Sequence, residues 1–502
     1  MKVQRIPKGT IRLLILLLSG FCVAQILSTV HLYFSNTAFH DKLMAVHHAG
    51  YLAVPNMQVA PHLNDWTSAF NGGLFFSLTS GLALTIFSIF AAWVRFNLSW
   101  EKTVPIILNL IWVAGLIMVN RNGFSSLITA YLIFIPCTIL PFFRKLFSCL
   151  SSCNDQLPAK FSLFFHVLLF VLFSIGCASQ MKVEKFLDIR DFLFLGNPTG
   201  EAINAFYYDN SLYSANYFKS FSQKLIKTCD LESLRDKQLK QQIRRILNYH
   251  DYLSLESFAQ ADLKTTVQDD MICLSHQKKI ILTVSVQDFL RSTKQYIHLF
   301  ESKTDRHAIF RIITMASLLF VGAILLYSIT FLLPFLLTKN VLNPAWSVVT
   351  AALICILILV VLLGVKGSNK INDLKHVAAA LKSEDSITRI KALRYIVDQT
   401  MDITLFPESE TLAINGTIPE RYWIAKALSR SRNPDSRNTL LRLLEDNHFN
   451  VVCMALHSMG KQGRKTDIPI ILEKIQSSNN WYVQWYAYKA LRNLGWYQKI
   501  MN

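Results

Sequence analysis

Seven long apolar stretches constrain this chain more than any other feature of its sequence. They lie at residues 12–33, 72–94, 103–120, 124–143, 161–179, 308–337 and 345–365. A helix that crosses the hydrocarbon of a bilayer needs about 20 mostly apolar residues. Only 17% of the 502 residues are charged, against about 25% in an ordinary globular domain. The sequence therefore predicts a multi-pass membrane protein, and it disfavours a wholly soluble enzyme or a disordered chain.

The apolar stretches divide the chain into four parts. We expect a membrane domain with five spans at 1–180, an extramembrane domain at 181–306, two further spans within 307–366 and a C-terminal domain at 367–502. The expected fold class is an all-α membrane protein with about seven transmembrane helices. The extramembrane domain is expected to be small and either α+β or helical.

The Lys and Arg residues of the short loops predict the orientation. Ten of them lie on the side of the N-terminus, and only Lys42 and Arg121 lie in the opposite short loops. Because Lys and Arg are enriched in the cytoplasmic loops of membrane proteins, the N-terminus is predicted to be cytoplasmic. Residues 181–306 and the C-terminal domain are then extracytoplasmic, in a bacterial inner (plasma) membrane, although one miscounted span would move the C-terminal domain to the cytoplasm.

The first apolar stretch could be a cleaved signal or a retained span. Its basic start is typical of a secretory signal. No small-x-small cleavage site follows, so we interpret it as a retained signal anchor.

Residues 181–306 are too polar for a span and too long for a loop. Apolar residues from Leu231 to Leu247 recur at helical spacing, whereas residues 279–286 are rich in β-branched residues and predict a strand. Cys229 and Cys273 are the only cysteines of this segment. They are candidates for a disulfide in an oxidising compartment, with two buried thiols as the alternative.

Aromatic residues crowd the stretch from Phe206 to Phe221. Core packing and the lipid–water boundary both favour such residues. A ligand or lipid groove is the alternative interpretation.

A repeat begins after the last apolar stretch. Ala-Leu pairs recur at residues 392, 427, 455 and 490, with separations of 35, 28 and 35 residues. A period of this length made of two helices indicates an α-solenoid. Small Ala residues let neighbouring helices approach, and each unit buries its apolar face against the next unit.

Three stretches carry a resemblance to a known family. They are Pro419–Leu428 with Leu440–Asp446, Asn450–Gly460 with Asp467–Leu472, and Trp481–Gly495. These stretches resemble HEAT repeats, over about residues 371–496, whereas the apolar stretches carry no such resemblance. The pattern departs from the family at Cys453 and Gln484, where Arg is usual, and residues 400–417 interrupt the first repeat. The resemblance implies a surface that binds a protein partner and implies no catalytic chemistry.

The last repeat is unusually aromatic. Its aromatic residues are Trp481, Tyr482, Trp485, Tyr486 and Tyr488. Packing and capping of the solenoid explain them simply. A contact patch for a partner or for the membrane surface is the alternative, because Trp and Tyr are enriched at interfaces.

Residues with catalytic or ligand chemistry are few. His40, His47, His48 and His62 gather in the first outward loop and are weak metal candidates. No Cys or carboxylate stands at ligand spacing, so solvated histidines are the simpler interpretation, and no metal or cofactor is predicted. His166, inside a predicted span, is an equally weak candidate.

The seven stretches contain no Asp or Glu, which disfavours an ion-coupled transporter. The sequence also lacks the common catalytic motifs, so no catalytic residue is predicted and an enzyme is the least favoured class.

Together these features predict a scaffold or assembly factor that recruits a protein partner through its C-terminal repeats. Membrane lipid is the second expected contact, and no motif supports nucleic-acid binding. The alternative is a transporter, channel or lipid-handling membrane component that uses the solenoid as a docking arm.

Overall fold

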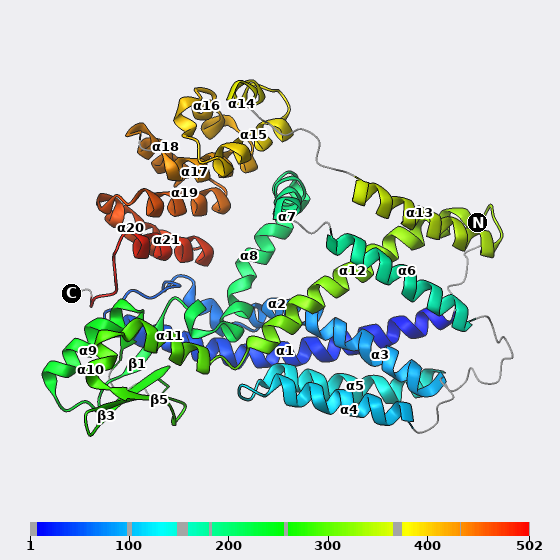
Figure 1. Cartoon of the computed structure of the whole chain (residues 1–502), viewed down its shortest axis with the longest axis horizontal. Coiled ribbons are helices and arrows are strands. Elements are labelled where there is room, and N and C mark those ends of the chain that lie inside the picture. The colour runs from blue at the N-terminus through cyan, green and yellow to red at the C-terminus, as the bar shows by residue number, and fades with distance from the viewer. Residues whose placement is uncertain are drawn as a thin grey trace. The chain divides into compact units, whose positions relative to one another are not determined.

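The computed structural model describes residues 8–97, 103–147, 159–179, 183–255, 260–364, 374–431 and 433–500 (Figure 1). These residues are mostly helical, with one small sheet. The chain forms two compact units, each built from three separated stretches. Unit 1 comprises Met1–His31, Gly73–Ile189 and Arg306–Lys370, and unit 2 comprises Leu32–Gly72, Arg190–Asp305 and Ile371–Asn502.

Every predicted apolar stretch is helical. The helices concerned are α1 (Lys8–His48), α2 (Trp66–Phe76), which continues through a π-helical turn (Ser77–Gly81) into α3 (Leu82–Asn97), α4 (Thr103–Val119), α5 (Ser126–Phe147), α6 (Ala159–Ser179), α12 (Ala308–Thr338) and α13 (Pro344–Gly364). A short helix, α7 (Val183–Asp188), follows α6 and leads into a π-helical turn (Ile189–Phe194).

Among the residues that the structure describes, four helices are long and apolar enough to cross a membrane, where the sequence predicts seven. They are Gly9–His48, Trp66–Phe96, Ser126–Phe147 and Ala308–Thr338. The other three predicted spans contain shorter apolar helices among the described residues, at Pro105–Val119, His166–Gly176 and Ala345–Val361. These apolar parts are shorter than the roughly 20 residues that a straight crossing needs, although helices α6 and α13 as a whole have 21 residues each.

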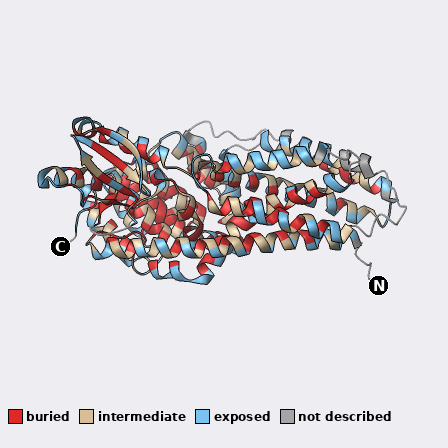
Figure 2. Cartoon of the chain, turned by 90° about the horizontal axis from the view of Figure 1, so that it is seen from below, coloured by how far each residue is buried: buried red, intermediate tan, exposed pale blue. Residues whose placement is uncertain are grey.

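The helices of unit 1 carry apolar side chains on their outer faces. Examples that are more than half exposed are Ile107, Leu110, Ile312, Leu333 and Leu357. Figure 2 shows such exposed residues in pale blue along these helices. Outward-facing apolar side chains suit a lipid environment rather than water.

Small residues bring the helices of unit 1 close together. A Cβ added at Gly81 would lie 2.5 Å from the Ala24 side chain. The Ser28 hydroxyl donates to the Gly73 carbonyl at 3.2 Å, and the Tyr131 hydroxyl donates to the Ala24 carbonyl at 3.0 Å. Close approach at small residues and hydrogen bonds between helices are how helices associate in membranes.

The middle part of unit 2 is an α+β domain, one of the two alternatives expected. Its sheet has the strand order β2-β1-β3-β4-β5. The strands are β1 (Lys227–Asp230), β2 (Tyr252–Ser254), β3 (Leu263–Gln268), β4 (Met271–His276) and β5 (Lys279–Ser285). Strand β1 pairs in parallel with β2 and β3, and β3, β4 and β5 are antiparallel. The predicted strand at 279–286 is confirmed as β5.

Four helices accompany this sheet. They are α8 (Pro198–Phe218), α9 (Lys237–Tyr249), α10 (Val286–Arg291) and α11 (Thr293–Lys303). Asn197 caps α8, because its side chain accepts a hydrogen bond from the Gly200 amide. Ile243 and Leu247 of α9 and Phe289 and Phe300 of α10 and α11 are buried in the core of the domain.

The C-terminal part of unit 2 consists of helix pairs. The helices are α14 (Leu374–Leu381), α15 (Ser386–Asp398), α16 (Glu408–Asn415), α17 (Ile418–Ala427), α18 (Asp435–Leu443), α19 (Phe449–Gln462), α20 (Ile468–Ser477) and α21 (Trp481–Asn493). Helices α15, α17, α19 and α21 contact one another in turn, and we call them the inner row. Each packs against the helix that precedes it in the chain. The inner row and the preceding helices therefore form a solenoid (Figure 1).

Residues 400–417 are expected to interrupt the first repeat as an insertion or as a degenerate unit, and the structure favours the degenerate unit. They form a 3-10 turn (Ile403–Leu405) and helix α16, which packs on α17 as α18 packs on α19. The stretch reads as irregular in sequence because α16 has only eight residues.

Candidate functional site

The inner row is closely packed at the recurring alanines. Ala392, Ala427, Ala455 and Ala490 are all at most 2% exposed. A Cβ added at Gly460 would lie 2.8 Å from the Cα of Ala490. These small residues let the helices stack side by side, as the sequence predicts, and they fix which side chains share one face.

Ion pairs between repeats use several cations of the solenoid. The pairs are Arg389 with Glu420 at 2.6 Å, Arg421 with Asp446 at 2.6 Å, and Arg437 with Asp467 at 2.8 Å. The Glu420 and Asp467 side chains are fully buried. A buried carboxylate must be paired to be tolerated, so these arginines stabilise the contacts between repeats.

A carboxylate from elsewhere in unit 2 lies against the inner row. Asp191, fully buried, accepts hydrogen bonds from Trp423 Nε1 at 2.7 Å and from Arg394 Nε at 3.1 Å. The neighbouring Arg190 guanidinium lies 4.1 Å from the centre of the Tyr422 ring. Burial raises the pKa of Tyr422, and the Arg190 cation counteracts that rise. The inner row therefore already binds one acidic residue of its own chain.

Helix α8 covers the aromatic residues of α21. Trp481 Nε1 donates to the Tyr208 carbonyl at 2.6 Å. The Tyr208 ring lies 4.4 Å from the Tyr482 ring and 5.3 Å from the Phe449 ring, measured between ring centres. The aromatic stretch 206–221 thus supplies a contact to the solenoid.

The first loop and the α+β domain also bind the last repeat. Asn56 Nδ2 donates to the Ile475 carbonyl at 2.9 Å, and Gln484 Oε1 accepts from the Asn56 amide at 2.8 Å. The Tyr488 hydroxyl lies 2.6 Å from Asp251 Oδ1. Gln484, where the repeat pattern usually has Arg, therefore holds the loop between α1 and α2, residues 49–65.

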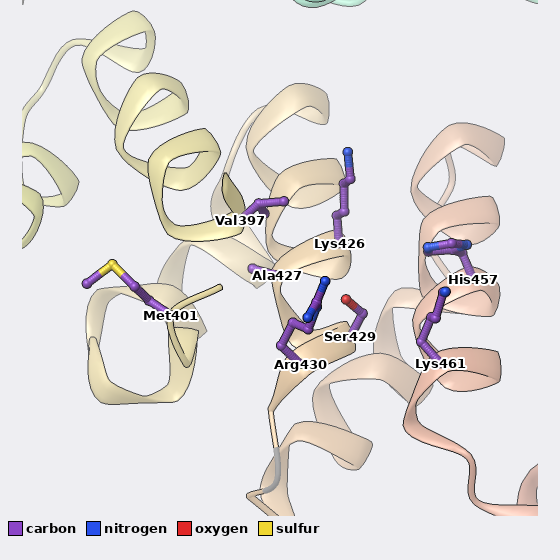
Figure 3. A pocket seen from close by; sticks show the side chains of 8 residues that line it. All are labelled: Val397, Met401, Lys426, Ala427, Ser429, Arg430, His457 and Lys461. Atoms are coloured by element: carbon purple, nitrogen blue, oxygen red, sulfur yellow. The ribbon is translucent and has the colours of Figure 1, made fainter. Parts of the chain in front are cut away.

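A pocket of about 520 Å³ opens on the inner row, next to the Asp191 contact, because its lining residue Lys426 lies 4.5 Å from the centre of the Trp423 ring. Its lining residues are Val397, Met401, Lys426, Ala427, Ser429, Arg430, His457 and Lys461. Figure 3 shows that they come from α15 and the loop after it, from α17 with its following turn, and from α19. Two lysines, an arginine and a histidine thus share one cavity with apolar groups.

The cations of the pocket repel one another. Burial lowers the pKa of His457, and Lys461, Lys426 and Lys489 lower it further. Burial also lowers the pKa of Lys426, with Arg190 contributing and Asp398 opposing. Positive charge is therefore unfavourable in the empty pocket, and an anion would relieve the repulsion.

The histidine candidates do not assemble into a metal site. His40 lies 3.3 Å from Asp41 and His62 lies 3.2 Å from Asp65, while the adjacent His47 and His48 rings are 6.1 Å apart. Among the described residues, no group of three or more His, Cys, Asp or Glu side chains is placed to hold a metal ion. In unit 1, His166 Nδ1 lies 2.9 Å from the Tyr327 hydroxyl, an ordinary hydrogen bond between helices.

Of the two alternatives for Cys229 and Cys273, the structure has the two buried thiols and not the disulfide. Both residues are buried free thiols. Cys229 lies on β1 and Cys273 on β4, with β3 between them. Two strand spacings are about 9.6 Å, whereas disulfide-linked Cα atoms lie within about 7 Å. Burial raises the pKa of the Cys229 thiol, which leaves it unreactive.

The five aromatic residues of α21 contact the chain itself. Trp481 and Tyr488 are buried, and Tyr482, Trp485 and Tyr486 are half-buried. Trp481 and Tyr482 contact α8, and Tyr488 contacts the α+β domain. Packing within unit 2 thus accounts for these three, and a partner-contact role for the five has no independent support.

The basic pocket was not predicted, although the sequence carries a signal for it. Lys426 and Lys489 each precede an Ala-Leu pair, so the repeat places them at equivalent positions on the inner row. His457 directly follows the Ala-Leu pair at 455, and Lys461 lies four residues, or about one helical turn, after His457. Cations recurring with the period of a solenoid indicate a charged face.

Comparison with known proteins identifies the repeats. Residues 417–492 match the family model for HEAT repeats, which confirms the resemblance noted in the sequence over most of the inner row. No curated protein and no solved structure matches the chain. HEAT repeats generally mediate protein–protein interaction, which is a property of the solenoid and not of any active site.

Proposed function

We propose that this chain is a multi-pass membrane protein that acts as a scaffold or assembly factor and recruits a protein partner through its C-terminal repeats. The observation that carries the proposal is the inner row itself. Part of this row is held by the chain's own α8, first loop and α+β domain, while the pocket beside them is lined by Lys426, Arg430, His457 and Lys461. A rigidly anchored face with an open charged pocket is suited to binding and not to catalysis.

The composition of unit 2 supports one choice for the number of spans. Residues 32–72, 190–305 and 371–502 form one compact unit, so we expect all three to lie on one side of the membrane. An even number of crossings must then separate each stretch from the next. If α12 crossed the membrane and α13 did not, the solenoid and the α+β domain would lie on opposite sides. The ion pair between Asp191 and Arg394 therefore favours counting both helices as spans. Seven spans satisfy this condition.

We place unit 2 outside the cytoplasm, with the N-terminus inside and the chain in a bacterial inner membrane. The support is the excess of Lys and Arg in the loops on the N-terminal side. The proposed partner would then be met outside the cytoplasm.

Site-specific photocrosslinking in native membranes tests the recruitment. A photoreactive residue replaces Ser429 or Arg430, which line the pocket. The matched controls carry it at the exposed positions Asn438 and Thr466 of the solenoid. We expect a distinct protein adduct from the pocket positions and none from the controls. Adducts only with lipid, or with equal yield at all four positions, would contradict a protein partner at this face.

A further inference from the structure

Some cations of the solenoid are held in ion pairs, and others have no ion pair among the described residues. The arginines at 389, 394, 421 and 437 each contact a carboxylate, and Lys474 contacts Glu445. Lys426, Arg430, Lys461 and Lys489 have no ion pair with any residue that the structure describes. We call the first three the pocket cations, because they line the cavity. Several unpaired cations around one cavity indicate the charge of its ligand more directly than the net positive charge of the domain does.

The inner row already binds one acidic residue, and that contact shows which side chains it uses. Asp191 is held between Arg394 and Trp423, and the Arg394 guanidinium lies 5.8 Å from the centre of the adjacent Phe192 ring. Lys426 lies on the other side of this Trp423, 4.5 Å from the ring centre. The Asp191 contact and the pocket are thus neighbours on α17, and the first contains a peptide carboxylate.

The size and lining of the pocket fit side chains. A volume of about 520 Å³ falls within the usual range of binding pockets, roughly 300–1,000 Å³. Val397, Met401 and Ala427 supply apolar surface for the methylene groups of a ligand, while Ser429 adds a hydroxyl. The lysines and Arg430 supply several donors for carboxylate oxygens.

We propose that this pocket binds acidic side chains of the partner, presented by a peptide segment that carries two or more Asp or Glu residues. The inference rests on the proposed function, because it assigns the chemistry by which the repeats recognise their partner. A peptide is favoured over a lipid headgroup because the ligand already bound on this row, Asp191, belongs to a polypeptide. Recognition through carboxylates predicts binding that weakens as salt rises.

The test measures binding of a fluorescent 12-residue Glu-rich peptide to the full chain in detergent. The control peptide has Gln at every Glu position. We compare wild type with Lys426→Gln/Lys461→Gln, which removes two pocket cations, and with Arg442→Gln/Lys465→Gln, which removes two exposed cations outside the pocket. We expect about tenfold weaker binding in the first variant, less than twofold change in the second, and no saturable binding of the Gln peptide.

Three results would overturn the pocket proposal. The first is equal affinity of the two peptides, and the second is equal affinity of wild type and the pocket variant. The third is pocket-dependent binding of phosphatidylglycerol vesicles with no binding of the Glu peptide, which would assign the pocket to lipid. If the pocket variant still gives the photocrosslinked protein adduct at wild-type yield, the recruitment proposal stands and the acidic-peptide proposal fails.

Discussion

Replacing Asp191 by alanine is expected to loosen the contact between residues 190–194 and the solenoid. The Asp191 side chain is fully buried, and it bonds to Arg394 and Trp423 at once. After the substitution, the Arg394 guanidinium, whose side chain is 12% exposed, loses this carboxylate. The indole N–H of Trp423 loses its acceptor in a buried position.

The magnitude follows from the burial. Removing one member of a buried ion pair costs about 3–5 kcal/mol. Because Arg394 retains some access to water, we expect the lower end of this range. Each 1.4 kcal/mol changes an equilibrium constant tenfold, so the local opening of α15 and α17 should become about a hundredfold more frequent.

Amide hydrogen exchange of the full chain in detergent measures this opening. The design is a double-mutant cycle with Asp191→Ala, Arg394→Ala and both together, read on peptides from α15 and α17. The control, Glu473→Ala, removes an exposed carboxylate from α20 and should cost less than about 0.5 kcal/mol. Unchanged exchange in Asp191→Ala, or strictly additive effects in the double variant, would refute the ion pair as the link between these segments.

Three further predictions follow from the packing, the charge and the topology. Ala455→Asp places a charge at a position that is fully buried in the inner row, so the unfolding temperature of the repeats should fall sharply; an unchanged temperature would mean that the repeat core is misplaced. The pKa of His457 is lowered in the folded chain. The neutral imidazole therefore contributes its full stabilisation above the unfolded pKa of about 6.5, and this stabilisation is lost as the pH falls below that value. His457→Gln should therefore flatten the decline in unfolding temperature between pH 7.5 and 5.5. Cysteines introduced at the exposed positions Lys278 and Asn438 should react with a membrane-impermeant maleimide from the same side of the membrane; labelling from opposite sides would exclude seven spans.

The repeats could be predicted because their signal is local and periodic. Alanines at a regular spacing mark where helices touch, and the structure buries all four of them. The long apolar helices were equally readable, since a run of apolar residues needs no knowledge of distant contacts. The number of these helices that span a membrane was harder to predict, because several have lengths close to the roughly 20 residues that a span needs.

The sheet of the α+β domain could not be read in the same way. Strands β1 and β2 have four and three residues, too few to show an alternating pattern. Strand β1 even buries Lys227, whose ammonium lies 3.0 Å from Glu301 Oε1. That pair joins residues 74 positions apart, and no local propensity encodes it.

The contacts between the inner row and the rest of unit 2 could not be predicted from the sequence, for the same reason. Asp191 and Arg394 are 203 residues apart, and neither stands in a motif. The aromatic residues of α21 were singled out correctly as unusual, yet sequence alone offers no means to tell a contact with α8 from a contact with another protein.

The bond between Leu52 and Gln498 has a consequence for how the chain is made. These residues are 446 positions apart, and a ribosome adds about 5–20 residues each second. The loop of residues 49–65 therefore waits about 20–90 seconds after its own synthesis before its binding site on the last repeat exists. During this interval Asn56 and its neighbours lack their final partners. Unit 2 is completed only when nearly the whole chain has been synthesised.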